Sequence, residues 1–566
     1  MKLQRFNLIV YLVLILSLFA CTETESPAVS KPEVSESRED LVARAGAPLF
    51  AGMGSHEHAI TTVSPEAQLY FNQGLVIDFA FNHAESARSF RAAQTLDPDC
   101  AMCFWGEALA LGPNINVTSN GKAIMSDEER QKAYAAIQRA VALKDGVSEV
   151  ERDYIEALAV RYNGDPSTPR EPLDEAYVTS MRELHQKYPA DDDAASLFAE
   201  SMMNTMPWDY WLDPESPKPL TVEVINALET VLERAPEHPL AIHLYIHAVE
   251  ASSRPGRAEA PADLLTDLVP GAGHLVHMPS HIYWRVGRYA DASAANVRAA
   301  GVDEEYIAAC NAQGFYPAAY YPHNIHFLWA ASSMEGRSAI AIGAARKVAA
   351  NVRLEMIKEF PGVEFFNTIP LLALTQFGHW DEVLAEPQPP EDLEYSNAIW
   401  HYVRATAYAR TGNLDAARAE HENFNGLRDA TDVTYLDSIY YPATMLLTIA
   451  DALMLGEIAM AEGNHEEAIA YFRTAVETQD ELPYTEPPFW YYPTRHTLGR
   501  ALLTSGDAAG AEQVYRDDLQ QYPRNGWSLF GLVQALEAQD KDAGEFQERF
   551  DNIWAQADVK LNASTF

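Results

Sequence analysis

Glycines at turn-like positions divide most of this chain into short helical segments. They are Gly287, Gly336, Gly378, Gly412, Gly463 and Gly506. On either side of each one, apolar residues recur at three- and four-residue spacing, and long alternating runs of β-branched residues are absent. From Gly378 to Gly412 the step is 34 residues. A chain of 566 residues with this punctuation predicts an array of helix pairs and not one ordinary core.

Small and aromatic residues follow the glycines at a fixed spacing, as in Ala468–Phe472, and "LGRALLTSGDAAGAEQVYRDDLQQYP" ends at Pro523. This pattern resembles the tetratricopeptide repeat: a helix, a tight turn at Gly, a second helix, and Pro before the next unit. The resemblance covers residues 64–553 in about a dozen degenerate pairs and implies an all-α, right-handed superhelical solenoid without sheet. Residues 46–63 are expected to form an N-terminal loop segment and residues 554–566 a C-terminal tail.

The N-terminus has the pattern of an export signal. Lys2 and Arg5 precede an apolar run that is too short for a comfortable transmembrane helix. "LSLFAC" resembles a bacterial lipoprotein lipobox, which implies cleavage before Cys21, lipidation of its thiol and, because Thr22 follows, an outer-membrane destination. Residues 1–21 are therefore expected to be a signal peptide with its lipobox, and residues 22–45, rich in Ser, Glu and Pro, a flexible tether.

Charge narrows the classes of partner. The chain has 41 basic and 81 acidic residues, a formal net charge of −40. This balance argues against nucleic acid and anionic lipid surfaces as partners and favours cations or basic peptides. Membrane contact is expected only through the lipid anchor.

Three cysteines remain beyond the lipobox: Cys100, Cys103 and Cys310. "PDCAMCFWG" admits a disulfide, a redox pair or two packed thiols. No thioredoxin-like βαβ pattern surrounds it, so packing or a structural disulfide is favoured over redox chemistry.

Histidines gather on one helix face of three successive repeats. In the tetratricopeptide repeat, the first helix of each pair presents one stripe of positions to the concave groove. Seven of the 17 histidines and one carboxylate fall on that stripe: His243, His247, Glu250, His274, His277, His281, His323 and His326. Ser280 takes the small-residue position where paired helices touch.

Helix packing alone rarely places histidine repeatedly at solvent-facing groove positions. When a histidine is buried by packing, each of its polar atoms needs a hydrogen-bond partner. Imidazole with some carboxylate suits a transition metal such as Zn, Fe or Cu, so we expect a metal site in the groove. Two alternatives stay open, namely metal-free hydrogen bonding to a polar ligand and a polar groove without special chemistry. "HLYIH" lacks the Glu of HExxH, so that peptidase mechanism is not supported.

Weaker candidates for the ligand-binding groove are Glu200, Trp284, His496 and Arg500. Trp490 and Tyr491 either help to hold an aromatic ligand or pack between helices. "WDYW" (208–211) either closes one wall of the groove or simply packs. His56 and His58 fall in a loop that either folds over the groove or is mobile, and a mobile loop is favoured.

Strings such as "FNHAESARSF", "HMPSHIY" and "YPHNIHFLWAA" are similar to those of bacterial tetratricopeptide lipoproteins of no assigned activity. Two classes of function remain. One is a cell-envelope binding solenoid whose groove takes a peptide, a protein or a small molecule. The other is a metal-dependent hydrolase or oxidoreductase that uses the same His and Glu residues. Tetratricopeptide arrays favour the first class, and more imidazoles than one ion needs favour the second.

Overall fold

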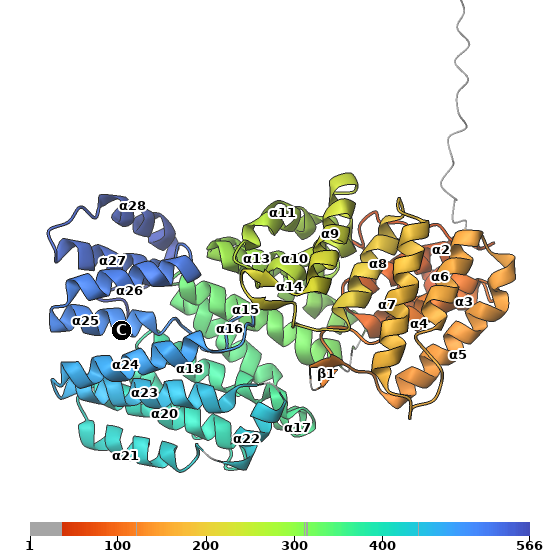
Figure 1. The fold of residues 1–566 in the computed structure, drawn as a ribbon. Helices are drawn as coiled ribbons and strands as arrows, with labels where there is room; N and C mark the ends of the chain where they lie inside the picture. The colour runs from red at the N-terminus through yellow and green to blue at the C-terminus, as the bar shows by residue number, and fades with distance from the viewer. Residues whose placement is uncertain (1–36, 120, 311, 313–314, 429, 440) are drawn as a thin grey trace, which may run out of the picture.

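The computed structural model describes residues 37–566 except 120, 311, 313–314, 429 and 440. The predicted signal peptide, Cys21 and most of the predicted tether lie outside the described residues. Within them the fold is all-α, as predicted, and antiparallel helix pairs follow one another along the chain (Figure 1).

The first helices of successive pairs form the inner row of the array. They are α2 (Pro65–Phe79), α4 (Ala101–Ala110), α6 (Glu149–Ala159), α8 (Asp192–Met203), α10 (Pro239–Val249), α12 (Gly273–His277) with α13 (Pro279–Val286), α15 (Tyr321–Met334), α18 (Ile369–Gln376), α20 (Glu394–Arg410), α23 (Ala443–Ala461), α25 (Arg495–Ser505) and α27 (Gly526–Glu537).

The second helices pack outside that row. They are α3 (His83–Leu96), α5 (Asp127–Leu143), α7 (Arg170–Lys187), α9 (Pro219–Arg234), α11 (Glu259–Leu268), α14 (Tyr289–Cys310), α16 (Ser338–Asn351), α19 (Trp380–Ala385), α21 (Leu414–Asn425), α24 (His465–Asp480), α26 (Ala508–Gln521) and α28 (Gly544–Ile553). Three further helices are α1 (Arg38–Ala45), α17 (Leu354–Glu359) and α22 (Thr431–Ser438).

The turn glycines have the backbone conformation that the pattern requires. All six of the glycines between pairs have positive φ, between 68° at Gly336 and 90° at Gly506. A residue with a Cβ is disfavoured there, whereas Gly adopts this left-handed conformation freely and ends a helix tightly. Small residues also let helices of neighbouring pairs approach. A Cβ on Gly106 would lie only 2.3 Å from the ring of Phe90.

Both ends of the array fold back against its central helices, so the concave face is enclosed. Nε1 of Trp527 in α27 donates to the carbonyl oxygen of Ser333 in α15 over 3.0 Å. From the other end, Nδ2 of Asn116 donates to the hydroxyl of Tyr320 over 2.9 Å. Figure 1 shows the blue C-terminal helices beside the green central ones. The predicted open, solvent-facing groove is therefore wrong, because distant contacts close it.

The C-terminal segment takes part in this closure. Trp554, just beyond α28, packs edge-on against Trp527 at a ring-centroid distance of 5.4 Å. Phe566, the last residue, contacts the same ring at 5.8 Å. The predicted tail is thus a docked segment.

Two insertions form short hairpins, which corrects the prediction of no sheet. β1 (Thr118–Ser119) pairs with β2 (Lys122–Ala123), and β3 (Trp211–Asp213) pairs with β4 (Ser216–Pro217), both antiparallel. They lie in two segments that are long for links between helices of the array, residues 111–127 and 206–219.

The N-terminal part of the described chain is more ordered than the sequence suggested. α1 occupies residues that were predicted to be tether, because Leu41 and Ala45 are buried against the first repeat. The following loop is fixed to α8, since Nδ1 of His58 lies 2.6 Å from Oδ2 of Asp193. His56 contacts the same carboxylate at 3.0 Å. The expectation of a mobile loop is therefore wrong.

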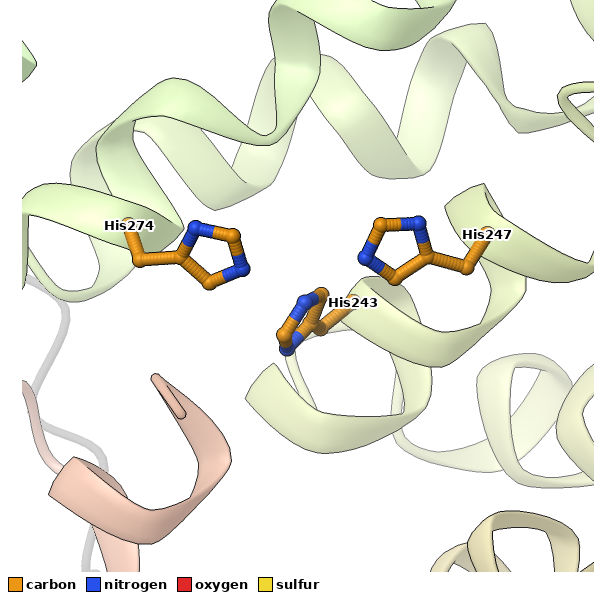
Figure 2. Close-up of side chains that lie close together, drawn as sticks. All are labelled: His243, His247 and His274. Carbon is orange, nitrogen blue, oxygen red and sulfur yellow. The ribbon is translucent and has the colours of Figure 1, made fainter. Parts of the chain in front are cut away.

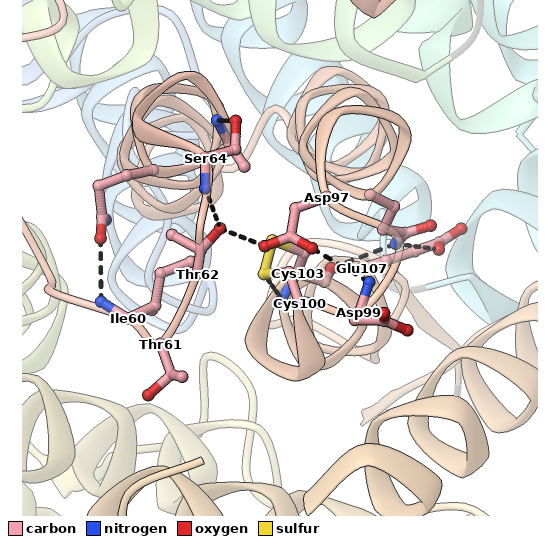
Figure 3. The surroundings of a disulfide bond; sticks show 12 residues. Ile60, Thr61, Thr62, Ser64, Asp97, Asp99, Cys100, Cys103 and Glu107 are labelled. Carbon is pink, nitrogen blue, oxygen red and sulfur yellow. Dashed lines mark hydrogen bonds between the residues drawn. A yellow bond between two sulfur atoms is a disulfide. The ribbon is translucent and has the colours of Figure 1, made fainter. Parts of the chain in front are cut away.

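A disulfide at "PDCAMCFWG" excludes one of the three alternatives, two packed free thiols. Cys100 and Cys103 are bonded at the start of α4 (Figure 3), and both are buried. The loop is held beside them, because Asp97 accepts hydrogen bonds from the hydroxyl of Thr62 and the backbone N–H of Val63. The disulfide thus lies where the N-terminal loop joins the first helix pairs.

Among the described residues, α23 is long and apolar enough to cross a membrane, and 67% of its apolar window is buried inside the fold. It packs between α20 and α24 as the first helix of a pair. Its apolar character is accounted for by this position in the core.

Candidate metal centre and pocket

Three histidines from two neighbouring helices of the inner row face a common point. His243 and His247 lie one turn apart on α10, and His274 lies on α12. Figure 2 shows the three rings turned toward one another. One ligand nitrogen from each ring lies within 4.8 Å of the other two. Two nitrogens on one tetrahedral zinc ion are about 3.3 Å apart, so modest ring rotations would bring all three onto one ion.

His243 and His247 each form a hydrogen bond through Nδ1, which leaves Nε2 free to face the common point. Nδ1 of His243 lies 2.6 Å from the carbonyl oxygen of Phe79, and Nδ1 of His247 lies 2.8 Å from Oε1 of Glu250. Each Nδ1 therefore donates a proton, which leaves a lone pair on Nε2. These two Nε2 atoms and both ring nitrogens of His274 are buried without a hydrogen-bond partner among the described residues. Such unpaired nitrogens are costly, and a ligand histidine has this kind of acceptor behind its ring.

A second group of imidazoles adjoins the first. His277, His281 and His323 also offer ligand nitrogens within 4.8 Å of one another. Nδ1 of His277 donates to Oδ1 of Asn296 over 2.7 Å, and Nδ1 of His281 donates to Oε2 of Glu250 over 2.6 Å. The Nε2 atoms of His277 and His281 then face each other at 2.9 Å. Glu250 accepts from one ring of each group and so joins the two.

Most of these rings are neutral. Burial lowers the pKa of His243, His274, His277 and His323 well below the ordinary value, and neighbouring imidazoles lower it further. Burial also lowers the pKa of His247, although Glu250 opposes the shift. Neutral imidazole is the form that binds a metal ion.

His281 is the exception. Burial lowers its pKa, but the charge and hydrogen bond of Glu250, with a further contribution from Glu486, outweigh this and raise it. Oε2 of Glu486 lies 3.5 Å from Nδ1 of His281, and burial together with the charge of Glu250 raises the pKa of Glu486. Without a metal ion, the proton shared among Glu250, Glu486 and the histidines lies on His281. Its Nε2–H then forms a hydrogen bond with Nε2 of His277.

A cavity of about 860 Å³ opens above the histidines. His247, His274, His281 and His323 line it on one side. The rest of the lining is largely aromatic and includes Tyr320, Trp329, Phe365, Tyr395, Tyr441 and Trp490. Trp208 and Asn116, from the two insertions, complete its walls, and the volume suits a small organic molecule. Of the alternatives for "WDYW", the structure supports the one in which it closes a wall.

Two predicted metal ligands have other roles. Glu250 is 1% exposed, and each of its oxygens accepts a hydrogen bond from a histidine Nδ1, so it orients rings instead of offering a free oxygen. His326 lines the cavity but belongs to neither group. Its ring stacks on Trp329 at 5.2 Å and meets Phe366 edge-on at 5.5 Å.

The four weaker candidates do not join the site. Trp284 is a core residue that packs against Phe327, at a centroid distance of 6.0 Å. His496 lies 2.6 Å from Nδ2 of Asn525 in the C-terminal repeats. Arg500 lies in the same repeats and pairs with a carboxylate of α23.

Glu200 is also apart from the histidines. It is a partly buried carboxyl whose pKa is raised to about 7 by burial and by the charge of Asp78, against the opposing charge of Arg161. It does not line the cavity that the described residues enclose.

Sequence reasoning missed the acceptors behind the rings and Glu486. The carbonyl of Phe79 and the amide of Asn296 could not be found from a histidine pattern, because one is backbone and the other lies on α14. Glu486 stands in the Pro-rich segment "LPYTEPPFWYYP", whose aromatic residues gave a signal only for packing or an aromatic ligand.

Comparison with known proteins supports the repeat. Residues 452–481, the second half of α23 and all of α24, match the tetratricopeptide repeat. The chain therefore contains at least one tetratricopeptide repeat, at residues 452–481. No curated protein matches the chain.

Solved structures with some similarity include three repeat proteins. A human IFIT1 dimer with m7Gppp-AAAA has a TM-score of 0.31 and 12% identity over 76% of this chain and 87% of that one. Yeast Tom70 has a TM-score of 0.27 and 11% identity, with 87% and 91% covered. The APC/C hetero-tetramer Cut9–Hcn1 has a TM-score of 0.25 and 12% identity, with 87% and 88% covered. All three TM-scores are far below 0.5.

Proposed function

We propose that this protein is a cell-envelope tetratricopeptide solenoid that binds a transition-metal ion in its interior and presents it to a small-molecule pocket. The observation that carries the proposal is the convergence of bare, buried nitrogens from His243, His247 and His274. Three imidazoles suit Zn, Fe or Cu and leave an open coordination position. The lipobox resemblance at Cys21 supports a lipid-anchored place in the bacterial envelope, with the outer membrane as its destination.

The pocket favours a small molecule over a peptide. Because both ends of the array close on its centre, an extended chain has no continuous groove to follow. The described lining residues include no Lys or Arg, and many of them are aromatic. We therefore propose an organic ligand with a largely apolar, aromatic body and one oxygen or nitrogen group that reaches the metal.

Turnover is the second candidate function. Glu486 lies beside His281 at the same cavity wall, and an ion with an open position could activate water or dioxygen on the ligand. A metal-dependent hydrolase or oxidoreductase would use this arrangement, whereas a binding protein needs only the ion and the aromatic wall.

Metal analysis of the untagged full chain in detergent tests the proposal. The protein is stripped with a chelator, loaded with Zn²⁺, Cu²⁺ or Fe²⁺, desalted and measured by mass spectrometry. We expect stoichiometric metal in the wild type and a reduced content in His274→Ala, which removes a ligand without breaking a side-chain hydrogen bond. His465→Ala, at the start of α24, is the control and should leave the content unchanged. Wild-type protein that retains none of these metals would refute the proposal.

A further inference from the structure

The second group of imidazoles has the features of a metal site in its own right. His277 and His281 lie one turn apart, and His323 reaches them from α15. Ring centroids of His277 and His323 are 4.8 Å apart, and those of His281 and His323 are 5.8 Å apart. His323 lines the cavity and makes no side-chain hydrogen bond among the described residues.

Two lone pairs in this group face each other. The amide oxygen of Asn296 accepts a hydrogen bond from Nδ1–H of His277, and Oε2 of Glu250 accepts one from Nδ1–H of His281. Both rings therefore turn their Nε2 atoms inward. At 2.9 Å these Nε2 atoms need a positive particle between them, either one proton or a metal ion. A metal ion also engages His323, which the proton leaves without a partner.

We infer that His277, His281 and His323 bind a second transition-metal ion beside the first, so that the centre is a pair of ions, each held by three imidazoles. The inference rests on the proposed function, because it adds a second ion to the first. The groups are adjacent, with ring centroids 5.4 Å apart for His247 and His281.

The six rings do not converge on one point. Their ligand nitrogens fall into two sets of three, each set within 4.8 Å, with Glu250 between them. Oε1 of Glu250 faces His247 in the first set, and its Oε2 faces His281 in the second. Hydrogen-bonded acceptors of this kind set the ring orientation of metal ligands. Here a single carboxylate does so for both sets.

The geometry also allows a different set of metal ligands, since ligand atoms of Glu250, His281 and Glu486 lie within 4.8 Å of one another. That set would use Nδ1 of His281 as the ligand atom. The 2.6 Å hydrogen bond to Glu250 requires a proton on this nitrogen, which excludes it as a ligand. His281 therefore belongs to the set that uses its Nε2.

Paired ions would select a bridging ligand. Four of the six ring systems line the cavity, and two of these, His247 and His281, come from different sets. The open positions of both ions would then face the same space. The expected ligand is an aromatic molecule with two neighbouring oxygen atoms, such as a catechol or an aromatic carboxylate, which can contact both ions at once.

Counting ions tests the inference. The untagged full chain, stripped of metal, is titrated with Co²⁺, whose absorption reports coordination by imidazole, and the desalted product is analysed for metal. At the two histidine groups, wild-type protein should bind two ions per chain and His323→Ala one; any Co²⁺ held by His56, Asp193 and His238 adds equally to both. His326→Ala is the matched control on the same helix, because it removes a cavity-lining histidine outside both sets, and it should still bind two.

The outcomes separate the two proposals. A wild type that stops at one ion, or a His323→Ala variant that still binds two, would overturn the inference and leave the proposed function standing. A wild type that binds none would refute the proposed function itself. Thermal melts of the metal-free variants check folding, and His323→Phe, which keeps a ring at the cavity wall, replaces His323→Ala if that variant melts early.

Discussion

Oε2 of Glu250 lies 2.6 Å from Nδ1 of His281, and the other oxygen of the same carboxylate lies 2.8 Å from Nδ1 of His247. These two histidines stand on different helices and in different groups of imidazoles. The carboxylate is 1% exposed, so its charge is balanced locally. Burial alone would raise the pKa of Glu250, but the charge of His281 and the two hydrogen bonds hold it below the ordinary value. One ionised side chain thus orients a ring in each group.

Replacing this carboxylate should weaken metal binding without removing a ligand. In Glu250→Gln, one oxygen becomes an NH₂ group that cannot accept from an imidazole N–H, so one ring loses its orientation. We expect the affinity for metal to fall about 10- to 100-fold. Competition with a chromophoric chelator measures it.

Glu420→Gln is the matched control for that variant. Glu420 accepts a 2.6 Å hydrogen bond from Nδ1 of His401, which forms a buried His–Glu pair away from the cavity. Its replacement should not change metal affinity. Equal losses in both variants would show that a general loss of stability, and not ring orientation, weakens binding.

The double variant His277→Ala plus His281→Ala should destabilise the metal-free protein. The groove positions were expected to carry little packing, but the two side chains are 0% and 3% exposed. Their removal leaves a cavity and takes the histidine donors from Oε2 of Glu250 and Oδ1 of Asn296, at a cost on the order of 2–5 kcal/mol. Urea unfolding of the apo protein measures this, with His465→Ala as the control. An unchanged unfolding free energy would show that the rings are not part of the core.

Local features of the fold could be predicted from the sequence. A turn glycine, a helical stripe and a small residue opposite an aromatic depend on residues that are close in the chain. The stripe therefore placed His243, His247 and His274 on one face, and the structure brings them together. The division into two groups follows from the same stripe once neighbouring helices are stacked.

Long-range contacts could not be predicted in this way. The hydrogen bond from Trp527 to Ser333 joins residues 194 positions apart, and no periodic pattern encodes it. Because such contacts close the array, they change an exposed groove into a buried cavity. They also bring Glu486 to His281 across 205 positions, which is why that carboxylate was absent from the predicted site.

Loss of the predicted lipidation site should change where the protein is found. In Cys21→Ser there is no thiol to carry lipid, so the chain should leave the membrane fraction and appear in the periplasm. Immunoblots of separated fractions measure this, and Cys310→Ser is the control because Cys310 lies in the folded array. A Cys21→Ser protein that stays in the membrane fraction would count against a lipid anchor.

The N-terminal loop should be held most firmly in mildly acidic solution. Asp193 lies near His56, His58 and His238, at 3.0, 2.6 and 3.1 Å. Burial would raise the pKa of Asp193, but the hydrogen bonds from these rings hold it well below the ordinary value. Burial lowers the pKa of His58, yet its hydrogen bond to Asp193 and the nearby acidic charges raise it overall.

The pKa shifts of Asp193 and His58 limit the stability of the loop at opposite ends of the pH range. The lowered pKa of Asp193 contributes stability that is present above about pH 4 and is lost as the pH falls below that value. The raised pKa of His58 contributes stability that is complete below about pH 6.5 and is lost as the pH rises through its folded-state pKa. Both contributions are therefore present together only between these limits.

Comparison of wild type with His58→Gln at several pH values tests this expectation. The difference in unfolding free energy should be largest near pH 5 to 6 and should shrink toward pH 8, since only the wild type loses a proton there. Hydrogen exchange of residues 55–62 should quicken over the same range. A chelator is included so that metal at His56, Asp193 and His238 does not contribute. Nδ1 of His238 accepts a hydrogen bond from the backbone N–H of Ala241, and its Nε2 faces Asp193. A difference that stays constant from pH 5 to pH 8 would show that His58 stabilises the loop by packing alone.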